Sequence, residues 1–486
     1  MGIRANVIGR RAIGGAAAAA VVVACALATG AHATDFGAND DTGKYATDGG
    51  APFYARMTGL GLKQTVITVR WAPADPAAVL ERKLLDITVP IAAAAGLKVV
   101  FATYPYPPRD IEAGFARAEA FAAWLTDLAR SYPQVKQFVV GNEPNQPAFF
   151  RPQFVRGRQV SAALFGPFLA AGYDALKSVD PTIQVIGVGL SPRGNDRPNA
   201  RSNVSTSPVR FLAALGRWYR RTGRQTPIMD GFSFHPYPNR ATDALTKGYP
   251  WPAAGFVNLG RIKQALWDAF NGTGQPTTLD GLKLYLDEVG WQVDTSGLPG
   301  YEGIENVPVT TEAHQAVVYR QLVEQAQCDQ DIAEVNIFGF FDDTQLEGFQ
   351  AGLNHADGTP RASAQAVQDA IARGCVTGPR TWAPTFGVVG AKRPNVLVVN
   401  GVLRVKVRAR EGAIARVCLL TGIHDSVSTE RALASTKTSG CVKGRVNGTA
   451  PLTLELPRSS GSATVGVQLS AEANPDRRTV DARPLP

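Results

Sequence analysis

Two glutamates, Glu143 and Glu288, are the residues of this sequence best suited to paired acid and nucleophile chemistry. Each follows a short apolar run, residues 137–141 in the first case and residues 283–287 in the second. A carboxyl pair can cleave a glycosidic bond when one group protonates the leaving oxygen and the other, ionised, attacks the anomeric carbon. In enzymes that retain the anomeric configuration, the two groups lie about 5 Å apart. The fold must therefore bring these two distant segments together.

Eight apolar runs are expected to form the strands that position these glutamates. They are continuous and not alternating, which is typical of strands buried on both faces. The runs are residues 34–37, 65–71, 98–103, 137–141, 184–189, 231–235, 283–287 and 334–340. Helical segments alternate with them, at residues 75–95, 111–131, 153–178, 207–222, 258–270, 311–327 and 362–373. This order predicts an α/β fold, a (β/α)8 TIM barrel. A doubly wound sheet is the alternative, but no early strand is followed by its usual glycine-rich turn.

The residues at the ends of the runs are expected to line the mouth of the barrel, where barrel enzymes place their active sites. Several of them carry charged, imidazole or aromatic groups, which are more frequent here than at the first residues of ordinary loops. They are Arg70, Trp71, Tyr104, Tyr106, Asn142, Glu143, His235, Tyr237, Asp287, Glu288, Trp291, Phe340 and Phe341. Tyr104 and Tyr106, together with Phe149, Phe150, Trp251 and Tyr301, are also candidate platforms for sugar rings.

Three segments resemble the motifs of glycoside hydrolase clan A, and most closely its cellulase-like and family-39-like members. Residues 140–145, Val-Gly-Asn-Glu-Pro-Asn, are similar to the Asn-Glu-Pro signature after strand four. Residues 285–291, Tyr-Leu-Asp-Glu-Val-Gly-Trp, are similar to the nucleophile motif of strand seven. Residues 351–361 are similar to the segment that leads into the last helix. The resemblance implies a retaining enzyme that acts on β-linked oligo- or polysaccharides.

The resemblance also implies a role for individual residues. Glu143 would be the general acid/base and Glu288 the nucleophile. Asn142 would bind the sugar 2-hydroxyl, Arg70 would orient Glu288, and Tyr237, or else His235, would contact Glu288. For His235, a structural hydrogen-bonding role is the competing interpretation to a substrate contact. Asp287 is either a second-layer group behind the site or a solvated carboxylate.

The sequence departs from the clan pattern after strand eight. Clan members usually place a tryptophan there as a floor for the sugar, and this chain has Phe-Gly-Phe-Phe at residues 338–341. Phe340 or Phe341 would take its place, or Trp291 would stack on the sugar instead.

Two other classes of function compete with hydrolysis. A metal-dependent barrel could gather an ion with Glu143, His235, Asp287 and Glu288, but strands three and five end in Tyr104 and Ser191, which are poor ligands. No metal and no cofactor is therefore expected. A non-catalytic glycan-binding barrel would normally have lost one carboxylate, and here both are present. A transglycosylase would use the same residues and stays an alternative.

The charge is distributed unevenly along the chain. The net charge is +9, but Arg4, Arg10 and Arg11 contribute three positive charges, and residues 384–486 hold 15 Lys or Arg against 7 Asp or Glu. The segment that carries the chemistry is thus nearly neutral, which argues against nucleic-acid binding. The basic tail would suit an anionic cell surface, and a solvated basic face is the competing interpretation.

The chain is expected to comprise a signal peptide at residues 1–33, a catalytic barrel at 34–382 and a β-sandwich at 383–486. A basic start, an apolar stretch and Ala31-His-Ala33 predict export, so a secreted or extracytoplasmic protein is expected. A lipid anchor at Cys25 is the less favoured interpretation, and the choice between the Sec and twin-arginine routes stays open. No segment is long and apolar enough for a membrane span.

Four cysteines remain after the signal, two in each predicted domain. The pairs Cys328–Cys375 and Cys418–Cys441 are the simplest of the three possible pairings, and an oxidising compartment favours them. Short alternating runs at residues 395–400, 402–408, 452–456 and 462–469 predict the sandwich. Residues 383–486 hold Phe386 as their one aromatic residue, so a structural or surface-associating role is favoured over sugar binding.

Long loops are expected to shape the substrate cleft. The loop of residues 191–210 contains Arg193, Arg197, Arg201 and Arg210, which could contact an acidic or branched glycan. The sequence leaves the sugar and its linkage open, and a monomer is expected.

Overall fold

The computed structural model describes residues 34–384, 394–421, 429, 432–433, 440–448, 450–457, 462–472 and 478–485 of the 486-residue chain. The predicted signal segment, residues 1–33 with Cys25, lies outside the described residues. None of the helices in the described part is both long enough and apolar enough to cross a membrane.

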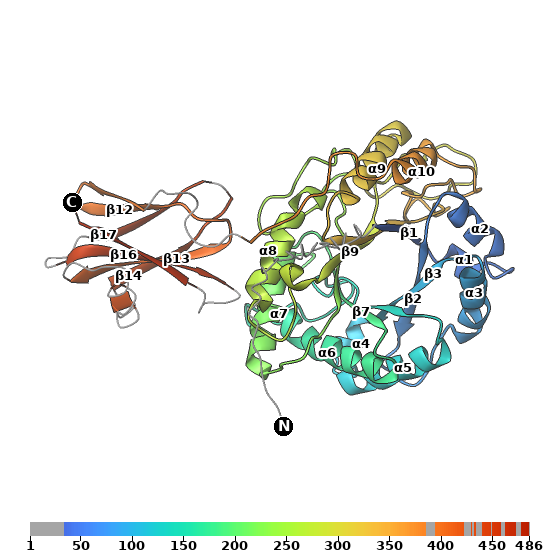
Figure 1. Ribbon diagram of the computed structural model, residues 1–486, viewed down its shortest axis with the longest axis horizontal. Helices are drawn as coiled ribbons and strands as arrows, with labels where there is room; N and C mark the ends of the chain where they lie inside the picture. Colours follow the sequence, from blue (N-terminus) through green and yellow to red (C-terminus); the bar gives the residue numbers. More distant parts are fainter. Residues whose placement is uncertain are drawn as a thin grey trace, which may run out of the picture. The chain divides into compact units, whose positions relative to one another are not determined.

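Eight parallel strands close into a barrel, as the sequence predicted (Figure 1). Around the barrel the order is β1-β2-β3-β4-β7-β8-β9-β10, and β10 pairs with β1 to close the ring. The strands are β1 Asp35–Asn39, β2 Gln64–Trp71, β3 Lys98–Pro105, β4 Gln137–Val140, β7 Gln184–Leu190, β8 Gly231–Phe234, β9 Lys283–Val289 and β10 Ile332–Phe338. Each of the eight apolar runs forms one of these strands, so the predicted barrel is confirmed.

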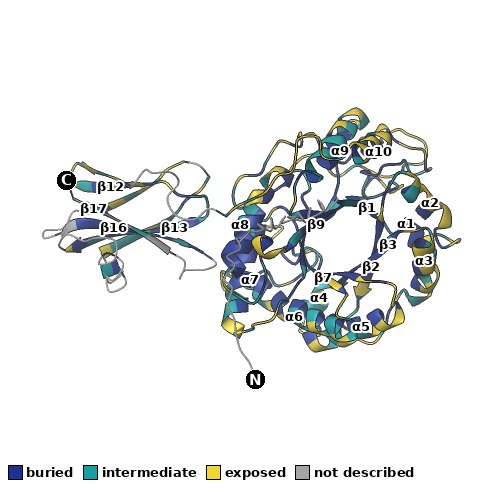
Figure 2. Ribbon diagram, in the orientation of Figure 1, coloured by how far each residue is buried: buried dark blue, intermediate teal, exposed yellow. Residues whose placement is uncertain are grey.

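Burial on both faces explains why these strands read as continuous apolar runs. One set of strand side chains, Val66, Val100, Ala102, Val139 and Ile186, packs together in a small separate core. The alternate side chains join the large core that includes the helices. In Figure 2 the strands are mostly dark blue, while yellow marks the outer faces of the helices.

One helix follows each strand on the outside of the barrel. They are α2 Ala51–Gly59, α3 Arg82–Ala94, α5 Ala118–Ser131, α6 Ser161–Val179, α7 Pro208–Thr222, α8 Leu259–Phe270, α9 Glu312–Ala326 and α10 Ala362–Arg373. The last four agree with the predicted helices to within one residue. Helix α2 was not located from the sequence.

Three helix predictions were wrong at their ends. Helix α3 begins at Arg82 and not near residue 75, because Trp71 and Trp124 donate indole hydrogen bonds to the backbone of the preceding turns. The predicted helix at 111–131 is split into α4 Pro108–Glu112 and α5, with Gly114 at a φ of +80° between them. Helix α6 starts only at Ser161, because residues before it form a small hairpin, β5 Phe154–Val155 and β6 Arg158–Gln159.

A polar cluster lies at the start of the strands inside the barrel. Glu334 on β10 accepts hydrogen bonds from the side chains of Gln64 (3.0 Å) and Gln137 (2.7 Å), and Lys98 forms an ion pair with it. Gln64 also donates to Asn336, at 2.9 Å. A buried carboxylate needs such partners, because an unpaired charge away from water is costly. The cluster belongs to the end of the barrel away from the mouth.

The C-terminal segment forms two antiparallel sheets. One has the order β11-β12-β15 and the other β14-β13-β16-β17. Their strands are β11 Asn395–Val399, β12 Val402–Val407, β13 Ala413–Thr421, β14 Cys441–Arg445, β15 Leu452–Pro457, β16 Ser462–Ala471 and β17 Arg478–Pro484. Residues of both sheets, such as Leu403 and Val405 from one and Val417 and Val467 from the other, share one core. This packing is that of the predicted β-sandwich.

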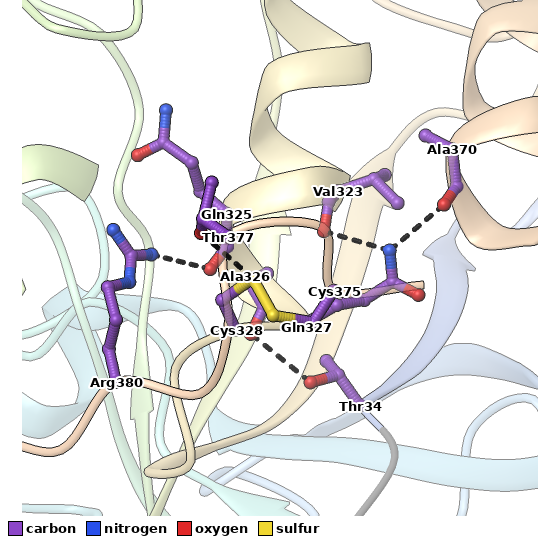
Figure 3. Close-up of a disulfide and its surroundings, with 10 residues drawn as sticks. All are labelled: Thr34, Val323, Gln325, Ala326, Gln327, Cys328, Ala370, Cys375, Thr377 and Arg380. Atoms are coloured by element: carbon purple, nitrogen blue, oxygen red, sulfur yellow. Dashed lines mark hydrogen bonds between the residues drawn. A yellow bond between two sulfur atoms is a disulfide. The ribbon is translucent and has the colours of Figure 1, made fainter. Parts of the chain in front are cut away.

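Both expected disulfides are present in the structure. Cys328, just after α9, is bonded to Cys375, just after α10, and so links the ends of the last two barrel helices (Figure 3). The side chain of Thr34, before β1, donates to the carbonyl of Ala326 nearby, at 3.3 Å. Cys418 and Cys441 are paired across β13 and β14.

Replacing Cys328 and Cys375 together by alanine should lower the free energy of unfolding of the barrel. The bond closes a segment with a sequence separation of 47, and the loss of loop-closure entropy for that length sets an upper value of about 4 kcal/mol. Urea unfolding followed by tryptophan fluorescence measures it, because all seven tryptophans precede residue 383. The matched control is the double replacement of Cys418 and Cys441, which should leave the barrel transition in place. An unchanged midpoint for the first variant would contradict the prediction.

Candidate active site

The turn after β4 presents Glu143 in an unusual backbone conformation. Gly141 has a φ of +115°, where a side chain would collide with Phe165. Glu143 itself has a φ of +40°, a left-handed conformation that costs a non-glycine residue about 1 kcal/mol. Its backbone N–H donates to the carbonyl of Gly189, near the end of β7, at 2.7 Å. The turn is therefore held against the neighbouring strand, which aims the carboxyl group at the barrel axis.

His235, which follows β8, lies between the two predicted catalytic glutamates. Its Nδ1 is 3.2 Å from Oε1 of Glu143 and 3.4 Å from Oε2 of Glu288. Ligand atoms of all three side chains lie within 4.8 Å of one another, so the two carboxyl groups are close together. This separation agrees with the spacing of about 5 Å that retaining glycosidases use.

Asp287 supports the histidine from the other side. Nε2 of His235 is 3.4 Å from Oδ1 of Asp287, and the hydroxyl of Ser233 donates to the same carboxylate. Asp287 is buried, with 3% of its surface exposed. Of the two interpretations offered by the sequence, a second-layer group or a solvated carboxylate, the structure has the first.

Tyr237 contacts Glu288 as the family resemblance implied. Its hydroxyl donates to Oε2 of Glu288, at 3.1 Å. Burial, together with the negative charges of Glu288 and Glu143, raises the pKa of Tyr237 well above its usual value. The phenol therefore stays neutral and keeps its proton for this hydrogen bond.

Arg70 lies in the cleft, but its hydrogen-bond partner is Tyr104 and not Glu288. Its Nε donates to the hydroxyl of Tyr104 at 3.1 Å, and its guanidinium lies over the ring of Tyr106, 5.0 Å from the centroid. Within the described residues, no hydrogen bond joins Arg70 to Glu288. Arg70 shares the cleft with Glu288, and it is held in place by the aromatic side chains at the end of β3 and just after it.

The site opens into a cleft of about 680 Å³ at the barrel mouth. Its walls come mainly from the ends of β10, β1, β2 and β3, with Glu288 and Asn142 at one side. Asn142 lies directly before Glu143 and lines the cleft.

Several wall residues were not predicted. Asp40 and Asp41 come just after β1, and Asp40 accepts hydrogen bonds from the backbone of Phe340 (2.7 Å) and Phe341 (2.9 Å). Asp41 accepts from the backbone N–H of Thr68 at 3.0 Å, so the loop after β1 is bonded to both neighbouring strands. The predicted first strand ended at residue 37, two residues too early. A longer strand would have placed these carboxylates among the mouth residues.

The aromatic floor of the cleft is made of phenylalanines. Phe338, Phe341 and Phe349 line it, and the rings of Phe338 and Phe349 meet edge to face with centroids 5.1 Å apart. Phe341 is therefore in the predicted region, and Phe340 is buried behind it, stacked on its ring. Phe349 lies in a loop with no strand to mark it, so no sequence signal pointed to it.

Trp291 does not line the cleft. It is 2% exposed, its indole N–H donates to the carbonyl of Asp243 at 3.0 Å, and its ring packs against Tyr319. The prediction that Trp291 could stack on a sugar is therefore wrong: the ring is part of the support under the loops after β8 and β9. Its place after the strand-seven motif carried no information on which way the ring points.

Of the six aromatic candidates for sugar platforms, the structure places some at the cleft and others away from it. Tyr104 and Phe149 line the cleft, and Tyr106 is exposed beside it. Phe150 is buried against Phe165, and the hydroxyl of Tyr301 donates to Asp342. The sixth, Trp251, is not among the residues lining the cleft.

Buried charges determine the electrostatics of the site. Burial raises the pKa of Glu288 to about 7, and Glu143 adds to the rise while His235 opposes it. Burial alone would lower the pKa of His235, but the charges of Glu288 and Asp287 outweigh it and raise the pKa well above 6.5. The imidazole is thus a cation among three carboxyl groups near neutral pH.

Glu143, His235 and Glu288 are also a possible set of metal ligands, because their donor atoms lie close together. A divalent ion would need a neutral imidazole nitrogen. A proton and a divalent ion would therefore compete for the imidazole of His235, whose pKa the neighbouring carboxyl groups raise.

Comparisons with known proteins find similar structures. No family model matches the chain, and no curated protein matches it. A family 39 glycoside hydrolase from Bacteroides cellulosilyticus WH2 matches with 15% identity over 88% of this chain and 81% of that one, at a TM-score of 0.49. A monomeric β-xylosidase from Caulobacter crescentus CB15 matches with 14% identity over 91% and 96%, at 0.43. A GH5_18 protein from Streptomyces cattleya, in complex with GlcNAc, matches with 15% identity over 72% and 83%, at 0.49.

The matched structures are glycoside hydrolases of families 39 and 5. At these identities and TM-scores the likeness concerns the barrel fold.

Glu288 should titrate near pH 7, and its neighbours should move that value in opposite directions. Glu143→Gln removes a negative charge that raises the pKa of Glu288, so the value should fall. His235→Asn removes a positive charge that lowers it, so the value should rise. Carbon-13 NMR of the glutamate carboxyl groups measures both shifts. Shifts of the same sign in the two variants would contradict the arrangement.

Proposed function

We propose that the protein is a retaining glycoside hydrolase that cleaves O-glycosidic bonds of a β-linked oligo- or polysaccharide. The observation that supports this most strongly is the close pair formed by Glu143 and Glu288 around His235, at the mouth of a closed barrel. The spacing leaves room for a nucleophile and an acid on one sugar, and too little for the water that an inverting enzyme places between them.

In the first step, Glu288 attacks the anomeric carbon and Glu143 donates its proton to the leaving oxygen. The product is a glycosyl ester of Glu288. In the second step, Glu143 takes a proton from water, the water attacks the same carbon, and Glu288 is released. Two inversions give net retention.

The neighbours act on the charge that develops in these steps. Tyr237 donates to Oε2 of Glu288, so Oε1 is the oxygen free to attack. The His235 cation lies near both carboxyl groups and favours the ionised form of Glu288, the nucleophile. Asn142 would bind the 2-hydroxyl of the sugar, and Phe338, Phe341 and Phe349 would support its ring.

Export is part of the proposal. It is supported by the signal-like N-terminus and by the two disulfides, which persist in oxidising compartments. Transglycosylation would differ only in the acceptor that replaces water, and product analysis with added sugar acceptors separates the two reactions. A metal content measurement on the purified protein tests the metal-dependent alternative, and stoichiometric metal would overturn the proposal.

Glu288→Gln should abolish hydrolysis of aryl β-glycosides, because the neutral amide cannot attack the anomeric carbon to form the ester. Glu143→Gln should lower kcat/KM by about 100- to 10,000-fold for substrates with poor leaving groups, and much less for activated ones that need no proton. Glu112→Gln, on the exposed surface, is the control and should behave as the parent protein. Proton NMR of the first product should show the β-anomer. An inverted product, or turnover by Glu288→Gln, would refute the mechanism.

The activity should depend on pH through Glu288. Attack requires the carboxylate, and burial raises the pKa of that group to about 7. The value of kcat/KM should therefore rise as pH increases through about 7, and His235→Asn should move this rise to higher pH. A pH–rate profile on an activated aryl glycoside checks it, and a rise centred near 4.5 would contradict the assigned burial.

A further inference from the structure

The cleft occupies one side of the barrel mouth. Its walls come mainly from the ends of β10, β1, β2 and β3 and the loops after them, with Asn142 and Phe149 from the loop after β4 and Glu288 from β9. The loops after β7 and β8 contribute none of its lining. Glu143, which protonates the leaving oxygen under the proposed function, lies on the boundary, after β4. A sugar held in the cleft therefore directs its leaving group over the loops after β4, β7 and β8.

These three loops are joined into one lobe, made of residues 144–160, 191–207 and 236–258. Asn145 is the main connection: its amide donates to the carbonyls of Ser191 (3.1 Å) and Thr206 (2.9 Å), and its oxygen accepts from the N–H of Ser191 at 3.0 Å. Thr206 also donates to Gln153, at 3.0 Å. Arg193 donates to the carbonyl of Asn239 at 3.3 Å, which adds the third loop.

The lobe is strongly basic. Its three segments carry eight Lys or Arg side chains and two Asp side chains. Six arginines are exposed on the first two segments: Arg151, Arg156, Arg158, Arg193, Arg197 and Arg201. Arg156 and Gly157, both at positive φ, form the tip of the small hairpin β5–β6.

The acidic groups of the lobe do not neutralise these arginines. Asp196 pairs with Arg210 at 3.3 Å, and Asp243 pairs with Lys247 at 3.7 Å. Among the described residues, none of the six arginines forms a salt bridge. Six guanidinium groups in one lobe repel one another, and an anionic partner would relieve that repulsion.

The opposite side of the mouth is negatively charged. The loop of residues 290–311, after β9, carries Asp294, Glu302 and Glu305 and no Lys or Arg. The loop after β10, residues 339–361, carries four acidic side chains, and its one arginine, Arg361, is buried in an ion pair with Asp342. An anionic group is thus attracted to one side of the mouth and repelled from the other.

We infer that the leaving-group side of the substrate is anionic: the protein cleaves a glycan that carries carboxylate or sulfate groups on the sugars beyond the scissile bond. The inference rests on the proposed function for its direction, since Glu143 defines the leaving-group side. Guanidinium groups suit both anions, because their paired N–H donors match two oxygens of a carboxylate or a sulfate.

Binding is measured in the Glu288→Gln background, so that no probe is consumed. The probes are β-1,4-linked oligomannuronates for carboxylate, carrageenan oligosaccharides for sulfate, and cello-oligosaccharides as a neutral set. We expect one anionic set to bind at least tenfold more tightly than the neutral set, and to weaken as NaCl is raised from about 0.05 to about 0.5 M.

The decisive variant replaces Arg193, Arg197 and Arg201 by glutamine. We expect the affinity for the preferred anionic set to fall about tenfold, because exposed charge pairs each contribute modestly and three act together. Hydrolysis of a neutral aryl glycoside, measured with Glu288 present, should stay within about twofold. The matched control replaces Lys63, Arg130 and Arg221 by glutamine, which removes the same charge from exposed sites outside the lobe.

Each outcome separates the inference from the proposed function. Equal affinity for anionic and neutral probes, or equal loss in the control variant, would overturn the inference while aryl glycosides are still cleaved. Tight binding of poly-glutamate equal to that of the glycans would also overturn it, because the lobe would then select charge alone. Absence of turnover on every aryl glycoside, with arginine-dependent glycan binding intact, would instead defeat the proposed function.

Discussion

The contact of His235 with three carboxyl groups is the interaction on which the rest of the site depends. Glu143 and Glu288 lie within hydrogen-bonding or near-contact distance of Nδ1, and Asp287 approaches Nε2. Buried charges of one sign are costly, and removing a compensating partner from such a group is strongly destabilising. The imidazole cation makes a close carboxyl pair tolerable at the bottom of a cleft. It also leaves Glu288 with a pKa near neutrality, where small changes in its neighbours alter its ionisation.

That contact is produced by backbone geometry at the ends of the strands. Glu143 adopts a positive φ that its N–H bond to Gly189 helps to hold. Gly189 is itself at a φ of +68°, and a side chain there would lie 3.3 Å from Nε2 of His235. The turn after β4 is therefore locally strained, and this conformation places the carboxyl group of Glu143. Such strain persists only where the surrounding structure holds it in place.

The same turn connects the chemistry to the outer surface. Asn145, two residues after Glu143, bonds the loops after β4 and β7 to each other, so the acid and the basic lobe share one support. On the far side, Asp40 joins β1 to β10 and forms part of the cleft wall. The mouth thus has an acidic, enclosed side and a basic, open side with the reacting groups between them. This separation of charge favours one orientation of a bound glycan across the mouth.

The sequence alone determined the barrel, because strands buried on both faces must be apolar throughout. It also determined that Glu143 and Glu288 lie at the mouth, because the ends of the barrel strands face the mouth. It also indicated the contact of Tyr237 with Glu288 and the two disulfides. The tertiary structure decided what depends on side-chain direction and on loops. Arg70 bonds Tyr104, Trp291 is buried under the loops, and Phe349 enters the cleft from an irregular segment. Periodicity reports which face of a strand is buried, but in a loop the direction of a ring is set by contacts with residues far away in the chain.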